Sequence, residues 1–433
     1  MDHDERLFKP GVGRKRLNKS MRPFELTPRE FLEVRELIKI LQALRKRRRR
    51  RQKLGLSFPG VSAVEKELLE LLKQKMTYSR SDLPQRQSLD PLCNTISSAF
   101  EHCGWDISRF QHCFAFKPNE LSRIVKIIYP QEQYTIPHKG RCSREELLLL
   151  VLFRLRLTVT SLTNTGLIFG REEEFVRIFT NLGFDLFYKR FYRLLDISNV
   201  KKIFQSNCFE IWKKSNIKKY RELSGEDVNT LPQYFEGTIA WMDGLRLDIC
   251  RPHKNQTCCY NGWLKKHNLM TAYVTSPDGF YLGRWDLHPG HLNDIAYQSY
   301  YHINQKLEDI GLKVGSDKGF FAQSFISPLP KENSLDPLLG ENTQKYISIM
   351  RTAACEWPNG SLRADFPFLN CKDKHRIYQG ISPNIYFTNC MILTNVLHFM
   401  RGSNSSLFFD LIPLLTAEEY LQSGIELHQS FSE

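Results

Sequence analysis

Three acidic residues occur at the ends of secondary-structure elements that the sequence predicts in the second half of the chain. Asp243 follows the apolar run 238–242, and Asp317 ends the short apolar run 312–316. If these runs are adjacent parallel strands, both acids lie at the same edge of one sheet, where the functional sites of open α/β sheets concentrate. Glu356 follows a helical pattern over about 343–355, so a helix beside the sheet would bring it to the same place.

Carboxylates held this close cannot all remain ionised without cations, so the cluster predicts divalent metal. Oxygen-only ligands favour Mg²⁺ or Mn²⁺ over zinc. Two such ions, about 3.5–4 Å apart, can activate a water or a 3′-hydroxyl and stabilise the leaving oxygen of a phosphodiester. Each acid alone is weak evidence, because Asp before Gly is more often a turn former. Spacing leaves four competing acids open: Asp248, Asp278, Asp286 and Asp294.

The elements that would position these acids follow one another between residues 236 and 355. Ser276-Pro277-Asp278-Gly279 is a strong hairpin-turn signal, and Pro289-Gly290 breaks the chain before a helix. The expected elements are strands at 238–249, 269–275, 280–287 and 312–317 and helices at 293–310 and 343–355. This order of strand, hairpin, helix and strand predicts an α/β core.

The preceding residues read as predominantly helical. Expected helices at 144–157, 172–182 and 188–195 are interrupted by a turn-like break at 167–171, which contains Gly170. Short helices around a glycine turn are compatible with a helix-turn-helix DNA reader and equally with any small helical bundle. The expected domains are a basic arm with helices (1–85), a helical region (86–235), the α/β domain (236–405) and a C-terminal tail (406–433).

The charge excess is concentrated in the first part of the chain. The formal net charge is +14, and residues 1–60 contain 18 basic and only 7 acidic side chains. The arm includes one uninterrupted basic run: Arg45, Lys46, Arg47, Arg48, Arg49, Arg50 and Arg51. Such a run suits phosphate backbones or a nuclear import receptor, so we expect a nuclear protein, with a solvated tail as the alternative. Lys265 and Lys266 are further DNA-contact candidates, although scattered surface bases are the default.

Hydropathy and cysteine content exclude several other classes of protein. The longest uninterrupted apolar stretch is seven residues, too short for a membrane span, and charged residues after Met1 argue against a secretory signal. Eleven cysteines with no C-x-x-C spacing favour reduced thiols. His102, Cys103, His112 and Cys113 form a ten-residue repeat that could bind zinc, but the spacing matches no familiar finger and favours buried thiols.

Four blocks, in order along the chain, resemble the Harbinger-type DDE transposases, especially those of fungi and oomycetes. WMDGLR at 241–246 resembles the family's first catalytic block, and HPGHLND at 288–294 its Pro-Gly…Asp block. SDKGF at 316–320 is similar to the block around the second aspartate, and RTAACEW at 351–357 to that around the glutamate. The similarity covers roughly residues 140–420.

This resemblance implies an RNase H-like α/β catalytic domain. Asp243, Asp317 and Glu356 would be the catalytic residues and would bind two Mg²⁺ (or Mn²⁺) ions, with Asp294 as an accessory position. The implied reaction is nicking of double-stranded DNA at transposon ends, followed by strand transfer of a 3′-hydroxyl to target DNA. The resemblance also implies a Myb-like DNA-binding partner. We further expect a homo-oligomer and, from the hydropathy, no membrane association.

The third block departs from the family pattern. Pro358 lies where the family continues a helix, and an interior proline removes a backbone donor and bends or restarts the helix. Arg351 is one residue further from Glu356 than is usual, as if a residue were inserted. These departures leave open an alternative: a catalytically inactive, domesticated or decayed transposase-derived DNA-binding protein.

Overall fold

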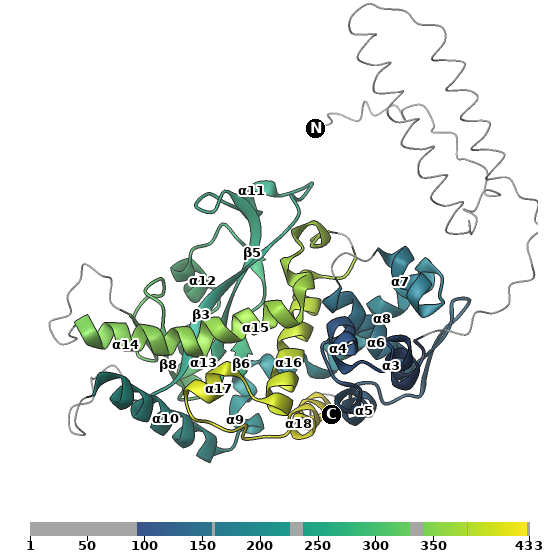
Figure 1. Cartoon of the computed structure of the whole chain (residues 1–433). Coiled ribbons are helices and arrows are strands. Elements are labelled where there is room, and N and C mark those ends of the chain that lie inside the picture. Colours follow the sequence, from purple (N-terminus) through teal and green to yellow (C-terminus); the bar gives the residue numbers. More distant parts are fainter. Residues whose placement is uncertain (1–92, 158–160, 226–236, 330–340, 379, 431–433) are drawn as a thin grey trace, which may run out of the picture. The chain divides into compact units, whose positions relative to one another are not determined.

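The computed structural model describes residues 93–157, 161–225, 237–329, 341–378 and 380–430, all within one compact unit, Asp90–Glu433 (Figure 1). The basic arm at 1–85, including Arg45 to Arg51, lies outside the described residues. Within the described part, mixed α/β structure is present, as the sequence predicts. No helix among the described residues is long and apolar enough to cross a membrane.

A mixed sheet forms the centre of the α/β region. Its main strand order is β4-β5-β3-β8-β9, with β6 and β7 also paired to β5. β3 runs antiparallel to β5 and parallel to β8, and β8 runs parallel to β9. The strands are β3 (Thr238–Asp248), β4 (Tyr260–Asn261), β5 (Lys266–Thr275), β6 (Tyr281–Arg284), β7 (His288–Pro289), β8 (Lys313–Ser316) and β9 (Ile326–Pro328).

The turn between β5 and β6 is where the sequence predicts a hairpin. Gly279 has φ +84°, a conformation that favours glycine, and its N–H donates to the Ser276 carbonyl at 2.9 Å. The single helix expected at 293–310 is instead two helices, α12 (Asp294–Tyr300) and α13 (Ile303–Asp309). His302 lies between them with φ +49°. A residue in the left-handed conformation cannot continue a right-handed helix, so the two helices are separate.

One long helical segment follows the sheet and carries the third acid. It consists of α14 (Glu341–Arg351), a π-helical turn η4 (Thr352–Glu356) and α15 (Trp357–Asp365) without a break between them. Short 3₁₀ turns follow at Pro367–Asn370 and Lys372–Lys374. The chain then forms three closing helices: α16 (Pro383–Arg401), α17 (Asn404–Phe408) and α18 (Ala417–Gln429).

The helical region before the sheet differs from expectation in two places. A two-stranded hairpin, β1 (Gln133–Ile136) with β2 (Gly140–Ser143), was not predicted, and the helices expected at 172–182 and 188–195 are one helix, α8, followed by a 3₁₀ turn. The helices here are α3 (Ile96–His102), α4 (Ile107–Phe114), α5 (Pro118–Ile128), α6 (Arg144–Arg156), α7 (Leu162–Phe169), α8 (Glu173–Phe191), α9 (Val200–Ile203) and α10 (Ser206–Ser224).

A shared hydrophobic core joins these regions. α6 is buried from Glu146 to Phe153, as expected of a helix that is apolar all round. Its one buried carboxylate, Glu146, receives two hydrogen bonds from Arg171, at 2.7 and 2.9 Å. α16 is buried over most of its length and packs against α8, α15 and α18 (Figure 1). α18, in the expected tail, therefore contributes to the core that supports the sheet.

Candidate active site

The first two predicted acids lie at one edge of the sheet because of the pairing of two parallel strands. Met242 of β3 is opposite Ser316 of β8, so the next residues, Asp243 and Asp317, are neighbours at the end of β8. β3 continues beyond this point to Asp248, whereas β8 ends at Ser316. Asp317 is held in the turn that follows, where its Oδ1 accepts the N–H of Lys318 at 2.7 Å.

Arg351 connects the first and third acids. Its Nη1 donates to Oδ2 of Asp243 at 3.1 Å, and its Nη2 donates to Oε1 of Glu356 at 2.6 Å. The Arg351 side chain is 11% exposed, that of Asp243 18% and that of Glu356 49%. Glu356 therefore shares one guanidinium with Asp243, at the boundary between the interior and solvent.

The electrostatics of Asp243 reflect this crowding. The pKa of Asp243 is raised to about 6, chiefly by burial and in smaller part by the nearby carboxylates of Asp317 and Glu356. The Arg351 charge and the hydrogen bond from the Gly244 N–H act in the opposite direction. A carboxyl group in this position stays ionised near neutral pH only because positive charge is close to it.

Asp294 extends the acidic group. It begins α12, directly after Asn293, whose side chain caps the helix by accepting from the Ala296 N–H at 2.8 Å. Burial raises the pKa of Asp294, with Arg246 opposing the shift and Asp317 adding to it. A Cβ on Gly319 would lie 2.6 Å from Oδ2 of Asp294, so this glycine leaves the space that the carboxylate occupies.

The π-helical turn explains the unusual spacing between Arg351 and Glu356. In η4 the N–H of Trp357 donates to the Thr352 carbonyl, five residues earlier, instead of four as in an α-helix. A single π turn accommodates one extra residue in an otherwise α-helical segment, and such turns are frequent at functional sites. Both Arg351 and Glu356 can therefore face the sheet, although they are five residues apart.

Pro358 is accommodated by the same turn. It lies in the first turn of α15, where no intrahelical donor is required, so the helical segment is not interrupted. Continued π pairing would direct the amide of residue 358 to the Ala353 carbonyl, and proline has no such N–H. The Ser405 hydroxyl donates to this carbonyl instead, at 2.6 Å. The proline therefore begins α15 without leaving the Ala353 carbonyl unsatisfied.

The π turn is also fixed to the sheet. The Tyr273 hydroxyl donates to the Cys355 carbonyl at 3.2 Å, and Tyr273 lies opposite Asp243 in the β3–β5 pairing. The Thr275 hydroxyl contacts the Cys355 thiol at 3.2 Å. These bonds set the distance between the element that carries Glu356 and the strands next to Asp243.

The competing acids have other surroundings. Asp248 pairs with Lys266 at 3.1 Å in the outer part of β3. Asp278 is fully buried in the β5–β6 turn, where it accepts hydrogen bonds from Ser276 and from the Trp212 indole. Asp286 is exposed and accepts from the Asn384 amide at 2.8 Å. In contrast, Asp294 lies with the predicted triad.

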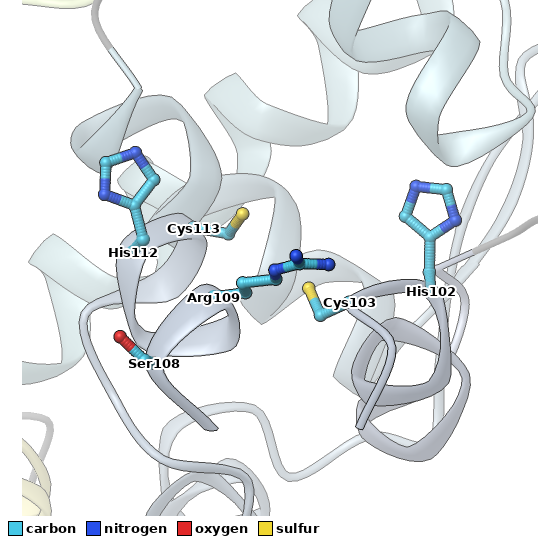
Figure 2. A pocket seen from close by; sticks show the side chains of 6 residues that line it. All are labelled: His102, Cys103, Ser108, Arg109, His112 and Cys113. Atoms are coloured by element: carbon cyan, nitrogen blue, oxygen red, sulfur yellow. The ribbon is translucent and has the colours of Figure 1, made fainter. Parts of the chain in front are cut away.

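The cysteine–histidine repeat lines a pocket in the helical region. Figure 2 shows His102 and His112 at opposite ends of this pocket, with Arg109 between them. Burial raises the pKa of both the Cys93 and the Cys113 thiols to about 12, which keeps them protonated. Within the described ranges, no three or more His, Cys, Asp or Glu side chains form a group that could hold a metal ion as placed. Cys93 is buried, whereas Cys103 and Cys113 are partly buried.

As placed among the described residues, the three acids at the sheet edge do not form a group that could hold a metal ion, and Arg351 supplies the positive charge between Asp243 and Glu356. Asp243, Asp317 and Glu356 offer carboxylate oxygens only, which Mg²⁺ and Mn²⁺ prefer. The sequence predictions did not identify Arg351 as the link between two acids. The signal for it was a basic residue near the end of the same predicted helix that carries Glu356.

Comparison of the chain with protein-family models, with curated proteins and with solved structures finds no match.

Proposed function

We propose that this protein is a Mg²⁺-dependent DNA endonuclease of the DDE type, related to the Harbinger-like transposases. The observation that carries the proposal is the position of Asp243 beside Asp317 on parallel strands, with Glu356 tied to Asp243 through Arg351. The sequence blocks that resemble the transposase family place the catalytic acids at these three residues. Cleavage of transposon ends and strand transfer to target DNA are the corresponding reactions.

The strand arrangement supports an RNase H-like fold for the catalytic domain. β6, β5 and β3 pair antiparallel in that order, and β8 and β9 continue from β3 in parallel. An RNase H-like domain would have a mixed sheet of this kind, with its first acid on the central strand and its second after the neighbouring parallel strand. Asp243 on β3 and Asp317 directly after β8 are compatible with these two positions.

In this proposal the chain's residues prepare the site before catalysis. Asp243, Asp317 and Glu356 would hold the ions, which, when bound, act as Lewis acids on the attacking and leaving oxygens of a phosphodiester. Asp243 must be deprotonated to serve as a ligand, and the Arg351 charge lowers its pKa. Arg351 must release at least one carboxylate when a cation arrives, while Tyr273 and Ser405 keep the π turn in place.

A second candidate is a catalytically inactive protein that binds DNA. The ion pairs of Arg351 favour it, because an internal guanidinium already neutralises the carboxylates that would otherwise need metal. Double-stranded DNA is the partner in both proposals. Nuclear localisation, a homo-oligomer and a Myb-like partner remain predictions from the sequence.

A cleavage assay distinguishes the two candidates. The full chain is incubated with labelled duplex DNA from the flanks of its own gene, with and without Mg²⁺, and each of Asp243→Asn, Asp317→Asn and Glu356→Gln is compared with Asp309→Asn, an exposed control. The endonuclease proposal predicts Mg²⁺-dependent nicking that the three site variants lose by at least about 10³-fold, roughly 4 kcal/mol of transition-state stabilisation. Nicking that survives all three changes would contradict the proposal, and binding without cleavage would favour the second candidate.

A further inference from the structure

A β-hairpin extends beyond the acidic edge of the sheet. β3 and β5 remain paired from Asp243–Tyr273 to Asp248–Asn268, which is roughly 16 Å at about 3.3 Å per residue. Beyond them, β4 pairs with the beginning of β5, with Tyr260 opposite His267 and Asn261 opposite Lys266. Figure 1 shows this end of β5, with α11 (Gln256–Cys259), standing away from the helices that cover the sheet. We call residues 260–266 the hairpin tip.

The tip exposes a large aromatic side chain on a fixed turn. Trp263 is 91% exposed, and Tyr260 and Leu264 beside it are about two-fifths exposed. The turn is anchored by the buried Asn261, whose side chain accepts the Leu264 N–H and donates to the Gly290 carbonyl, both at 2.9 Å. Because the backbone of the turn is already ordered, binding of a ligand to Trp263 costs the protein little conformational entropy.

The chain that forms the tip carries basic side chains and no acidic ones, and the carboxylate of Asp248 on β3 pairs with Lys266 at 3.1 Å. The sequence contains no acidic residue between Asp248 and Asp278. Four basic side chains of this stretch are exposed: Arg251, Lys254, Lys265 and Lys266. An exposed aromatic ring among exposed basic groups is the arrangement that single-stranded or distorted nucleic acid requires, because bases stack on the ring and phosphates pair with the cations.

We propose that the hairpin tip binds DNA, with Trp263 stacking on an unpaired or unstacked base and Lys254 and Lys265 contacting the backbone. The position of the tip relative to the substrate rests on the proposed function, because the hairpin leaves the sheet at the edge that carries Asp243. A protein interface is less consistent with the tip, since lysines are depleted in such interfaces. The partner is therefore a nucleic acid with at least one base out of its stack.

Binding of the full chain to fluorescent DNA, in EDTA so that no cleavage occurs, tests this inference. Two probes are compared: a plain duplex and the same duplex with one unpaired 2-aminopurine. Trp263→Ala should bind the second probe about 5- to 150-fold more weakly, the effect of losing one base–aromatic stack, and should no longer quench its 2-aminopurine fluorescence. Trp263→Phe should retain most of both effects, and Trp105→Phe, which changes an exposed tryptophan of the helical region, should change neither.

Three results would overturn the inference. The first is that Trp263→Ala binds both probes as tightly as wild type, and the second is that Trp105→Phe weakens binding as much as Trp263→Ala does. The third comes from a parallel assay with phosphatidylserine vesicles, in which Trp263→Ala loses binding to the vesicles but keeps its binding to DNA. Lys265→Ala should lower the slope of log affinity against log salt by about 0.9 if it contacts a phosphate. Since these assays need no cleavage, failure of the endonuclease proposal and failure of this inference give different results.

Discussion

Arg351 and Asp243 form an ion pair that joins the end of a helix to the central strand of the sheet, with Nη1 and Oδ2 3.1 Å apart. The other terminal nitrogen of Arg351 binds Glu356 at 2.6 Å. Partly buried charges are costly unless paired, so this guanidinium allows two carboxylates to face one another before any cation binds. The arrangement predicts competition between Arg351 and divalent metal.

Substitution of Arg351 should therefore change metal affinity. In Arg351→Gln the pKa of Asp243 should rise further above its ordinary value, because the charge that lowers it is lost. At a pH high enough to ionise Asp243 in both proteins, Mg²⁺ should bind more tightly to the variant, because no internal cation competes. The rise in melting temperature with Mg²⁺ concentration measures this affinity. Arg351→Lys, which keeps the charge, serves as the control, and weaker Mg²⁺ binding by Arg351→Gln alone would contradict the competition.

The hydrogen bond from Ser405 to Ala353 should stabilise the π turn only because Pro358 lacks an amide hydrogen. Ser405→Ala should lower the free energy of unfolding by about 1–3 kcal/mol, the cost of a buried carbonyl left unpaired. In a Pro358→Ala background, whose new N–H can reach the same carbonyl, the cost should be smaller. Urea denaturation of the four proteins measures the coupling. Equal costs of Ser405→Ala in both backgrounds would show that the hydroxyl does not replace the missing donor.

Asp278 should make stability depend on pH. Burial raises its pKa to about 6, despite hydrogen bonds from Ser276 and Trp212. Because this folded-state pKa lies above the unfolded value, the stabilisation is complete below about pH 4 and is lost as pH rises through about 6. The loss is on the order of 3 kcal/mol for a shift of about two units. Asp278→Asn should remove this part of the decline between pH 4 and pH 8 in chemical denaturation, whereas the exposed Asp309→Asn should retain it. Parallel pH profiles for wild type and Asp278→Asn would refute the assignment.

The sequence predicted the elements whose local signals are strong. The β5–β6 hairpin follows from Ser276-Pro277-Asp278-Gly279, and two short apolar runs identified the strands before Asp243 and Asp317. The single long helix expected at 293–310 was wrong because His302 adopts a left-handed conformation, which the apolar pattern does not indicate. The hairpin of β1 and β2 was missed because these short strands lie among strong helical patterns.

The sequence could suggest which acidic residues belong to the candidate site, but it could not predict how their side chains are arranged. Asp243 and Asp317 could be placed together because parallel strands end at a common edge. The π turn could not be derived from periodicity, because its hydrogen bonds depend on tertiary partners: Tyr273 on β5 and Ser405 on α17. Pro358 suggested a disturbed helix, whereas the structure shows that the helical segment continues past it with a donor from another element.

A crystal structure of the full chain soaked in Mn²⁺, with anomalous diffraction, would show whether the acids at the sheet edge bind metal. We expect anomalous density about 2.1 Å from carboxylate oxygens of Asp243 and of Asp317 or Glu356, with the Arg351 guanidinium withdrawn from at least one of them. Absence of Mn²⁺ at the sheet edge, with Arg351 still bonded to both Asp243 and Glu356 at saturating metal, would contradict it.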